Sequence, residues 1–292
     1  LSGKPVHNYT ISMSDVSYVI LATLVILAIE ALTGSLKGSR RRDFGVTALC
    51  FLSNSAVTRP LAAVLIGSLV AVLLPAHAGA LSDMPLWQSF LLGFFLMEFG
   101  FYWMHRWSHE GQRKHSRLSW LWKIHRTHHS ADQLNVSVTM RQNIFWAFLV
   151  PNSWIVGLAI YLGLGQGAAL ALIVIYAWNL LTHTHYRWDD AVLTSPAFRA
   201  LQHVIVTPSM HHSHHGFGTN GKMYRNYAVM FSGFDWLFGT LHLPSGRPSR
   251  YGIPGETPSW TEEVFYPLTL VTDAITRRRG QQTAERNPLK SD

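Results

Sequence analysis

The amino-acid sequence predicts an all-α integral membrane protein, a bundle of about four transmembrane helices with a cytoplasmic helical cap that carries a histidine-rich dimetal site. Three observations support this fold class. Of the 292 residues, 48% are hydrophobic and only 14% are charged, whereas an average soluble protein has ~25% charged residues. Several apolar stretches approach the ~20 residues that a helix needs to cross a bilayer. Three clusters of histidine follow the ends of such stretches.

The apolar stretches divide the chain into four parts. We expect N-terminal membrane helices in residues 1–104, a first cytoplasmic histidine-rich segment in 105–143, a transmembrane helical hairpin in 144–182, and a cytoplasmic histidine-rich cap with a basic tail in 183–292. The candidate spans are residues 16–33, 44–76, 86–104, 144–164 and 167–181. Arg59-Pro60 interrupts the second stretch, which is therefore either one kinked span or an interfacial helix followed by a short span.

The distribution of basic residues predicts the orientation of these helices. Lys37, Arg40, Arg41 and Arg42 follow the first apolar stretch, whereas a signal peptide would carry its basic residues in front. Cytoplasmic loops are enriched in Lys and Arg, so the N-terminus is expected outside and this cluster inside. Counting crossings from there places all three histidine clusters on the cytoplasmic side. The protein is thus expected to be a multi-pass membrane protein.

Charge and cysteine content exclude several classes of function. The net charge of +8 lies largely in short runs beside apolar segments, which favours contacts with anionic lipid headgroups over binding of nucleic acid. Cys50 is the only cysteine, so an intramolecular disulfide and a thiolate metal cluster are both excluded. A metal site in this chain must use nitrogen and oxygen ligands.

The three histidine clusters have the spacing of metal ligands. His105 and His109 are four residues apart, and the spacing HxxHH occurs twice, so each cluster can present its imidazoles on one face of a helix. One ion rarely needs more than four or five ligands, and eight clustered histidines therefore indicate two ions. We predict as ligands His105, His109, His125, His128, His129, His211, His214 and His215. His183, where the last apolar stretch ends, is predicted as a further ligand and His185 as a possible one.

Other polar residues near the clusters receive weaker predictions. Glu98 and Tyr102 extend the helical face of His105 by three- and four-residue steps. We expect Glu98 to pair with the second N–H of a ligand imidazole or with the metal, and Tyr102 to support the site; the alternative is a glutamate that faces a neighbouring helix. His212 is out of spacing and is not expected to bind metal. His242 is expected to be an ordinary surface residue.

The ligand type and the position of the clusters narrow the choice of metal. Imidazole nitrogens can hold zinc, copper, nickel or iron. A structural zinc needs only four ligands, and a hydrolytic zinc pair would usually show bridging carboxylates, which the clusters lack. Two irons would form an oxygen-activating centre beside the C–H bonds of lipid chains. A membrane metal-transport protein is the alternative from another class, although it would place its ligands within the spans.

At these residues the chain resembles the fatty acid hydroxylase/sterol desaturase superfamily of integral-membrane di-iron oxygenases. The resemblance covers residues 98–240, about half of the chain. FYWMHRWSHE at 101–110 is similar to the family pattern YYWxHRxxHE, and LWKIHRTHHS at 121–130 to LWxxHxxHHS. The TPSMHHSHH run at 207–215 is similar to TPxxHxxHH, and DWLFGT at 235–240 to the family's closing motif.

The resemblance implies a function. It implies two iron ions, dioxygen as co-substrate, and hydroxylation of a C–H bond in a lipid or other hydrophobic substrate, or desaturation of a sterol or fatty acyl lipid on the same site. The chain has no HPGG-type haem-binding motif, so electrons are expected from a separate ferredoxin, cytochrome or reductase. Two positions depart from the family pattern: Glu98 stands where many members carry Asp, and His185 where Asn is common. The expected walls of the substrate site are aromatic: Phe145, Trp146, Trp154, Tyr176 and Trp178.

Overall fold

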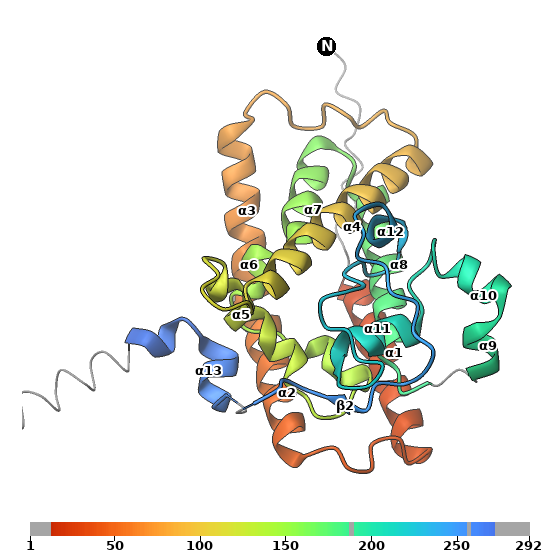
Figure 1. Ribbon diagram of the computed structural model, residues 1–292. Helices are drawn as coiled ribbons and strands as arrows, with labels where there is room; N and C mark the ends of the chain where they lie inside the picture. Colours follow the sequence, from red (N-terminus) through yellow and green to blue (C-terminus); the bar gives the residue numbers. More distant parts are fainter. Residues whose placement is uncertain (1–12, 187–189, 256–257, 272–292) are drawn as a thin grey trace, which may run out of the picture.

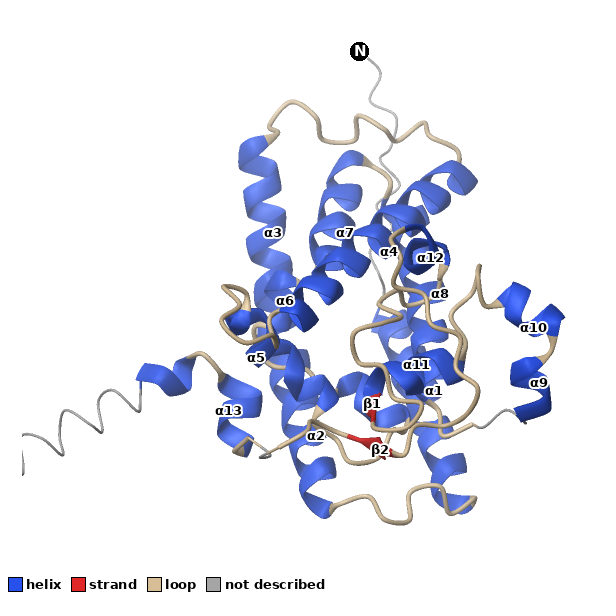
Figure 2. Cartoon of the chain, in the orientation of Figure 1, coloured by secondary structure: helices blue, strands red, loops and turns tan. Residues whose placement is uncertain are grey.

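The computed structural model describes residues 13–186, 190–255 and 258–271, and most of them are helical (Figure 1). The α-helices are α1 (Met13–Leu32), α2 (Arg41–Ser53), α3 (Arg59–Leu73), α4 (Leu86–Glu110), α5 (Ser119–His129), α6 (Trp146–Leu149), α7 (Pro151–Leu162), α8 (Gly165–His183), α9 (Asp190–Thr194), α10 (Pro196–Leu201), α11 (Pro208–His215), α12 (Gly233–Leu237) and α13 (Trp260–Phe265). A π-helix, η1 (Asn54–Thr58), and a 3-10 helix, η2 (Val136–Met140), complete the helical elements of these ranges. Figure 2 also shows strands β1 (Gly216–Phe217) and β2 (Arg250–Tyr251), which pair antiparallel.

The Arg59-Pro60 interruption is resolved as a π-helical turn inside one long helix. The elements α2, η1 and α3 follow one another without a break from Arg41 to Leu73. Pro60 has no N–H and its ring crowds the preceding turn, and the helix widens there so that the Arg59 N–H donates to the Asn54 carbonyl. The Asn54 amide donates to the Cys50 carbonyl (2.8 Å) and the Gln142 carbonyl (2.9 Å), which stabilises the widened turn.

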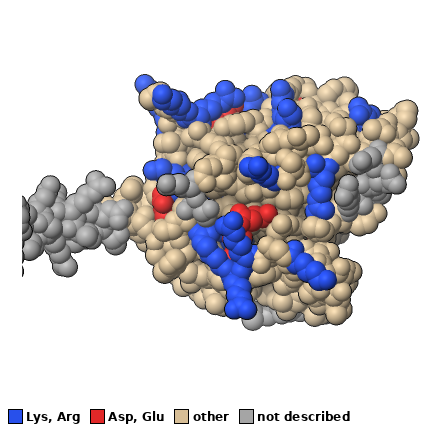
Figure 3. All heavy atoms as spheres, turned by 60° about the horizontal axis from the view of Figure 1, so that its bottom comes forward, with Lys and Arg blue, Asp and Glu red and all other residues tan. Residues whose placement is uncertain are grey.

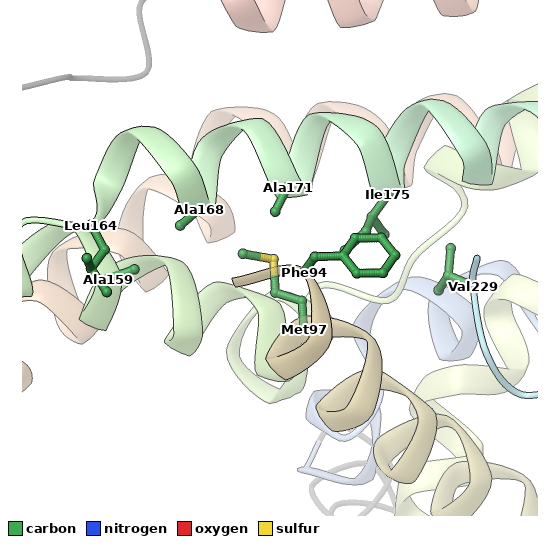
Figure 4. Close-up of a cluster of buried hydrophobic side chains, with 8 residues drawn as sticks. All are labelled: Phe94, Met97, Ala159, Leu164, Ala168, Ala171, Ile175 and Val229. Carbon is green, nitrogen blue, oxygen red and sulfur yellow. The ribbon is translucent and has the colours of Figure 1, made fainter. Parts of the chain in front are cut away.

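The apolar helices α3, α4, α7 and α8 form one half of the molecule, and α4 crosses α8 at close range. A Cβ atom on Gly93 would lie 3.3 Å from the Ala168 Cα, and one on Gly167 would lie 2.0 Å from the Ser89 Oγ. Small residues at such crossings let helices approach closely, which is how helices associate in lipid. Figure 4 shows the core that results, in which Phe94 and Met97 of α4 face Ala168, Ala171 and Ile175 of α8.

The number of membrane crossings is only partly supported. Two helices of the described residues are long and apolar enough to span a bilayer, Arg41–Leu73 and Gly165–His183, and the described apolar part of α1, Ile20–Leu32, is shorter. The expected single helix over residues 144–164 is wrong, because Val150 is extended before Pro151 and separates α6 from α7. At 12 residues, α7 is only ~18 Å long. The count of about four spans stays a prediction.

The helices α5, α11 and α13 and the two-stranded sheet lie at the other end of α4 and α8, and α12 packs beside α4 (Figure 1). We call these elements and the loops between them the cap. Fully buried Arg141 fixes this cap to the long helix. Its guanidinium donates to the carbonyls of Thr127 (2.9 Å) and Asp43 (2.9 Å), to the Ser130 hydroxyl (2.8 Å) and to the Glu263 carboxylate (3.1 Å). Because α2, α5 and α13 all meet this one side chain, the helix that carries three of the predicted ligands has a fixed position.

Candidate metal centre

The predicted ligands gather into two buried groups of four histidines. Within each group, one ring nitrogen of every histidine lies within 4.8 Å of the others. Group 1 consists of His105, His109, His129 and His214, and group 2 of His128, His183, His211 and His215. All eight side chains are buried. The structure therefore brings together eight of the predicted ligands, as two sites rather than one.

Helical spacing explains how the clusters divide between the groups. His105 and His109 of α4 are four residues apart on one face and both belong to group 1. Adjacent residues of a helix point in different directions, so α5 gives His128 to group 2 and His129 to group 1. In the same way α11 divides its histidines between the groups, and α8 supplies His183 to group 2.

In group 1, two imidazoles present bare nitrogen lone pairs to each other. The Nδ1 atoms of His105 and His214 lie 2.7 Å from the carbonyl oxygens of Tyr227 and Arg225, respectively. A carbonyl oxygen can only accept, so each Nδ1 carries the proton and each neutral ring has an unprotonated Nε2. These two Nε2 atoms are 2.9 Å apart. No hydrogen bond can join two acceptors, whereas a cation between them would satisfy both.

Group 2 contains a second pair of the same kind. His128 Nδ1 donates to the Val138 carbonyl (3.1 Å), and His183 Nδ1 donates to the Asn179 carbonyl (2.7 Å). Their Nε2 atoms are 3.1 Å apart. The backbone carbonyls thus fix the tautomer and orientation of these rings, as second partners of metal-bound imidazoles do. One such pair in each group shows that these residues fit two cations.

Burial favours the uncharged form that a metal ligand needs. Desolvation lowers the pKa of His128 to about 4 and that of His214 to about 3. Like-charge repulsion among the rings lowers the pKa of His129 and His211 further, after the larger effect of desolvation. The imidazoles are consequently neutral at pH 7, with lone pairs available for coordination.

Two of the predicted ligands lie outside both groups. His125 borders group 1, since its Nε2 is 3.1 Å from that of His129, and its ring packs on Trp146 with centroids 4.9 Å apart. The possible ligand His185 is not brought to either group. Its ring nitrogens lie 3.0 and 3.2 Å from the Arg247 guanidinium, a cation that opposes metal binding there, and its backbone N–H donates to Glu30.

Glu98 and Tyr102 lie behind the metal groups and hold a loop. The partner expected for Glu98, an imidazole N–H or the metal, is wrong: its carboxylate accepts from the backbone N–H groups of Met230 (3.1 Å) and Phe231 (2.9 Å). The Tyr102 hydroxyl contacts the Thr240 hydroxyl (2.9 Å) and accepts from Arg106 (3.1 Å). His212, which was not expected to bind metal, uses both ring nitrogens on Tyr251 and the Thr184 carbonyl.

Asp235 is a supporting residue to which the sequence analysis gave no role. Its carboxylate accepts from the N–H groups of Tyr227 (2.8 Å) and Ala228 (2.9 Å) and from the Thr240 hydroxyl (2.7 Å). The Tyr227 carbonyl in turn accepts from His105 Nδ1. Asp235 therefore positions His105 of group 1 indirectly, through the backbone of Tyr227. The DWLFGT motif was the signal in the sequence, but only the fold shows what it contacts.

A cavity of about 800 Å³ connects the histidines with the apolar helices. His105, His125, His128 and His211 line one part of it, and residues of the long helix Arg41–Leu73, α7 and α8 line most of the rest. Of the five aromatic residues expected in its wall, Trp146 and Tyr176 line it. The other three do not: Phe145, Trp154 and Trp178 pack elsewhere, and the two tryptophans donate to the Phe148 and Val206 carbonyls. The cavity can hold an apolar chain against both groups.

Known proteins are similar to part of the chain. Human alkylglycerol monooxygenase (Homo sapiens) is 31% identical over 164 residues, which cover 55% of this chain and 32% of the relative. An ornithine lipid hydroxylase of Rhizobium tropici is 32% identical over 180 residues (59% and 47%), and a very-long-chain aldehyde decarbonylase of Oryza sativa subsp. japonica is 24% identical over 204 residues (66% and 29%). The chain thus spans less than half the length of these relatives.

No solved structure matches the chain significantly. Residues 90–240, just over half of the chain, match the family described as fatty acid hydroxylase. This range holds every residue of both histidine groups together with Glu98, Tyr102 and Asp235. The matched region is therefore the one that brings the two histidine groups together, and the chain belongs to the fatty acid hydroxylase family.

Proposed function

We propose that the protein is a membrane-bound hydroxylase that inserts oxygen into a C–H bond of a lipid, using two iron ions, dioxygen and electrons from a separate protein. One observation carries the proposal. Each histidine group contains a pair of bare Nε2 atoms about 3 Å apart, and histidines of both groups line one apolar cavity of about 800 Å³. An apolar substrate in that cavity lies against two cation sites.

The ligand set favours iron with oxygen chemistry over hydrolysis. In the described residues neither group contains a carboxylate, whereas hydrolytic metal pairs usually have bridging carboxylates. Nitrogen ligands suit iron as well as zinc and copper, so the ligands alone do not select the metal. The names of the relatives, a monooxygenase and a hydroxylase, support insertion of oxygen, and the resemblance of the histidine motifs to those of di-iron oxygenases supports iron. Iron bound by both groups would supply the activation of dioxygen for C–H oxidation.

The protein's own residues position the reactants. Backbone carbonyls of Tyr227, Arg225, Val138 and Asn179 hold four ligand rings in one tautomer. Trp146 packs on His125 and lines the cavity, where its indole excludes water beside the histidines. The apolar walls orient the hydrocarbon, and oxidation without desolvation would lose the reactive oxidant to water.

Metal transport fits the arrangement less well. A transport site needs ligands that follow one another along a path through the spans, where an ion can leave each position. Here the two groups lie side by side: His128 and His129 are adjacent in α5, and the His129 ring stacks on that of His215 with centroids 4.2 Å apart. Their deep burial supports a resident metal centre.

The distribution of charge supports a cytoplasmic location for the cap. Figure 3 looks towards the lower end of Figure 1 and shows Lys and Arg side chains spread over that face, with few acidic ones. Lys37, Arg40, Arg41 and Arg42 precede or begin α2 at this end. By the positive-inside rule we assign this end, and with it the metal centre, to the cytoplasm, where a soluble electron carrier can reach it.

Metal analysis and lipid analysis together test the proposal. The full chain, produced under iron-replete conditions, should contain close to two irons per molecule and consume dioxygen when a reductant and its substrate are present. Lipids of cells that make the active protein should show species heavier by one oxygen than those of cells that make a His128→Ala variant. Near-stoichiometric zinc in the iron-replete protein, with no oxygen-dependent product, would contradict the hydroxylase assignment. Products lighter by two hydrogens would indicate a desaturase.

A further inference from the structure

The Arg59 side chain lies on the cavity side of the long helix. The residues of this helix that line the cavity are Phe51, Asn54, Ser55, Arg59, Ala62, Ala63, Ile66 and Gly67. They recur at steps of three and four residues and so form one continuous face. Arg59 and Ser55 of this face are also exposed, so the cavity is open to the surroundings at this level. The π-helical turn of η1 comes directly before Arg59, and such turns are frequent at functional sites.

Arg59 is a cation without a counter-charge. No hydrogen bond or ion pair joins its guanidinium to any residue that the structure describes, and among the described lining residues it is the only one of the Lys, Arg, Asp and Glu types. A charge within an apolar helix is expensive, and it is kept where it has a partner or a function. Arg59 is also exposed, so an anion from outside the described chain can reach its guanidinium.

Asn152 adds a second unpartnered polar group to the same cavity. Its Oδ1 is buried and accepts no hydrogen bond in the described structure. The helices α3 and α7 run parallel, since the Tyr161 hydroxyl near the end of α7 donates to the Leu74 carbonyl at the end of α3. A Cβ on Gly157 would lie 2.5 Å from Ile66, which aligns the two helices in height.

The alignment puts Arg59 and Asn152 at similar heights in the cavity. Arg59 precedes Ile66 by seven residues and Asn152 precedes Gly157 by five, so they lie ~10 and ~8 Å below this contact at 1.5 Å of rise per residue. On the other side of the contact the lining is mainly apolar, with Ile160, Leu170 and Ile173, and includes one amide, Gln166. The cavity thus has a polar level at Arg59 and Asn152 and an apolar extension beyond it.

We propose that Arg59 and Asn152 form an anion subsite in which the acidic headgroup of an amphiphilic substrate binds, while its hydrocarbon tail fills the apolar part of the cavity. The guanidinium pairs with the negative charge, and the Asn152 carbonyl accepts from a hydroxyl or N–H of the headgroup. This assignment rests on the proposed function and makes it more specific. It gives the substrate class as lipids with an acidic headgroup rather than a neutral one.

Equilibrium binding tests the subsite without turnover. The full chain in phosphatidylcholine nanodiscs is titrated with radiolabelled hexadecyl phosphate and with hexadecanol, which differ only in the headgroup. The wild-type protein should bind the phosphate at least about tenfold more tightly, as a charge-assisted hydrogen bond to arginine implies. Arg59→Gln should abolish this preference and leave hexadecanol binding unchanged. Asn152→Leu should weaken the binding of hexadecanol, whose hydroxyl donates to the Asn152 carbonyl, by about two- to tenfold.

Arg41→Gln is the matched control, because Arg41 is an exposed arginine of the same long helix that does not line the cavity. It should bind both ligands like the wild-type protein. Arg59→Lys keeps the charge and should retain part of the preference, which separates lost charge from misfolding. Equal binding of the two ligands by the wild type, or equal effects of the Arg59 and Arg41 variants, would overturn the subsite. Displacement of hexadecyl phosphate by inorganic phosphate at equal concentration would overturn its assignment to an amphiphile. Since binding is read without oxidation, each of these outcomes leaves the hydroxylase proposal standing.

Discussion

The cap and the apolar helices are built with opposite distributions of polarity. On α3, side chains such as Leu61 (56%), Val64 (67%) and Val72 (74%) are exposed. In the cap, Arg141 and Asp235 are fully buried. The exposed apolar surface of α3 suits contact with hydrocarbon, in which apolar side chains need no burial. In the cap, each buried polar group needs a hydrogen-bond partner, and these partners determine the positions of the histidines.

This contrast shows where a substitution should matter. In the cap, a buried polar side chain is connected to the histidines by a few hydrogen bonds, so its substitution should alter their positions. On the outer face of α3, a substituted side chain contacts only what surrounds the protein. Energetic effects should therefore be largest at the ligands, smaller at the groups that hold them, and smallest on the apolar surface.

Loss of a ligand should have the largest effect. His128→Ala and His214→Ala each remove one Nε2 of a bare pair, so one metal position loses a ligand and its partner ring is left with an unsatisfied lone pair. We expect turnover to fall at least about a thousandfold, in line with the loss of a group that acts as part of a unit. Metal content, measured by mass spectrometry, should fall with it.

His242→Ala is the control for this experiment, because His242 belongs to neither metal group. It should retain both metal and activity. A His128→Ala protein with full metal content and activity would show that the division of the histidines into two groups is wrong.

Removal of one partner of the buried Arg141–Glu263 pair should have the next largest effect, on stability. The two side chains are fully buried and 3.1 Å apart. Arg141→Met leaves the Glu263 carboxylate buried without this cation and should lower the free energy of unfolding by about 3–5 kcal/mol. Denaturant titration in detergent micelles measures the change. Glu110→Gln, which breaks the half-exposed Arg106–Glu110 pair, should cost less than about 1 kcal/mol. Similar costs for both variants would contradict the special role of Arg141.

Acidification should destabilise the cap. Burial lowers the folded-state pKa of His128 to about 4, so between pH 6.5 and pH 4 the unfolded chain binds a proton that the folded chain does not. Stability from this residue is present above pH 6.5 and is lost as the pH falls to 4, by about 3 kcal/mol at most. Release of metal from protonated imidazoles acts in the same direction. Thermal unfolding from pH 8 to pH 5 measures this, and a constant melting temperature over that range would contradict it.

The sequence predicted local features of the fold well and tertiary ones poorly. The helix over 86–104 and its continuation through His109 follow from an apolar run and i,i+4 spacing, and both are present in α4. The break before Pro151 was missed because an uninterrupted apolar run gives no sign of the backbone conformation at Val150. The π-helical turn at Asn54 was not predicted either, since it depends on Asn54 reaching Gln142, 88 residues away.

The same limit applies to the site. Spacing identified seven of the eight histidines that the structure brings together, and the end of the last apolar stretch identified the eighth, His183. Neither signal could divide them into groups, because α4, α5, α8 and α11 must first be packed. The spacing also included His125, which borders group 1, and position alone suggested His185, which faces Arg247. For Glu98 the helical face was right and the partner wrong, since the loop at Met230 returns from 132 residues away.

Loss of the Asp235 carboxylate should have a moderate effect on metal affinity. Asp235→Ala removes the acceptor of the Tyr227 and Ala228 N–H groups, and the Tyr227 carbonyl then no longer holds His105 firmly. Substitutions of such indirect partners typically reduce metal affinity by about 10- to 100-fold. Competition with a chelator measures the affinity. Asp83→Ala, at an exposed aspartate, should leave it unchanged; equal affinities for wild type and Asp235→Ala would remove Asp235 from the support of the site.

The smallest effect is expected on the outer face of α3, and a matched pair of leucines tests it. Leu65 is 49% exposed on α3 and does not line the cavity, whereas Leu134 is 2% exposed in the cap and packs with Val138 and Ala131. Leu134→Ala leaves a hole in a packed core and should cost about 2–5 kcal/mol of unfolding free energy. Leu65→Ala exchanges one apolar surface for another and should change it by less than about 0.5 kcal/mol, because lipid tails solvate both side chains. Reversible unfolding in lipid bicelles compares the two variants. If Leu65→Ala cost as much as Leu134→Ala, the outer face of α3 would be packed against another protein surface and would not face lipid.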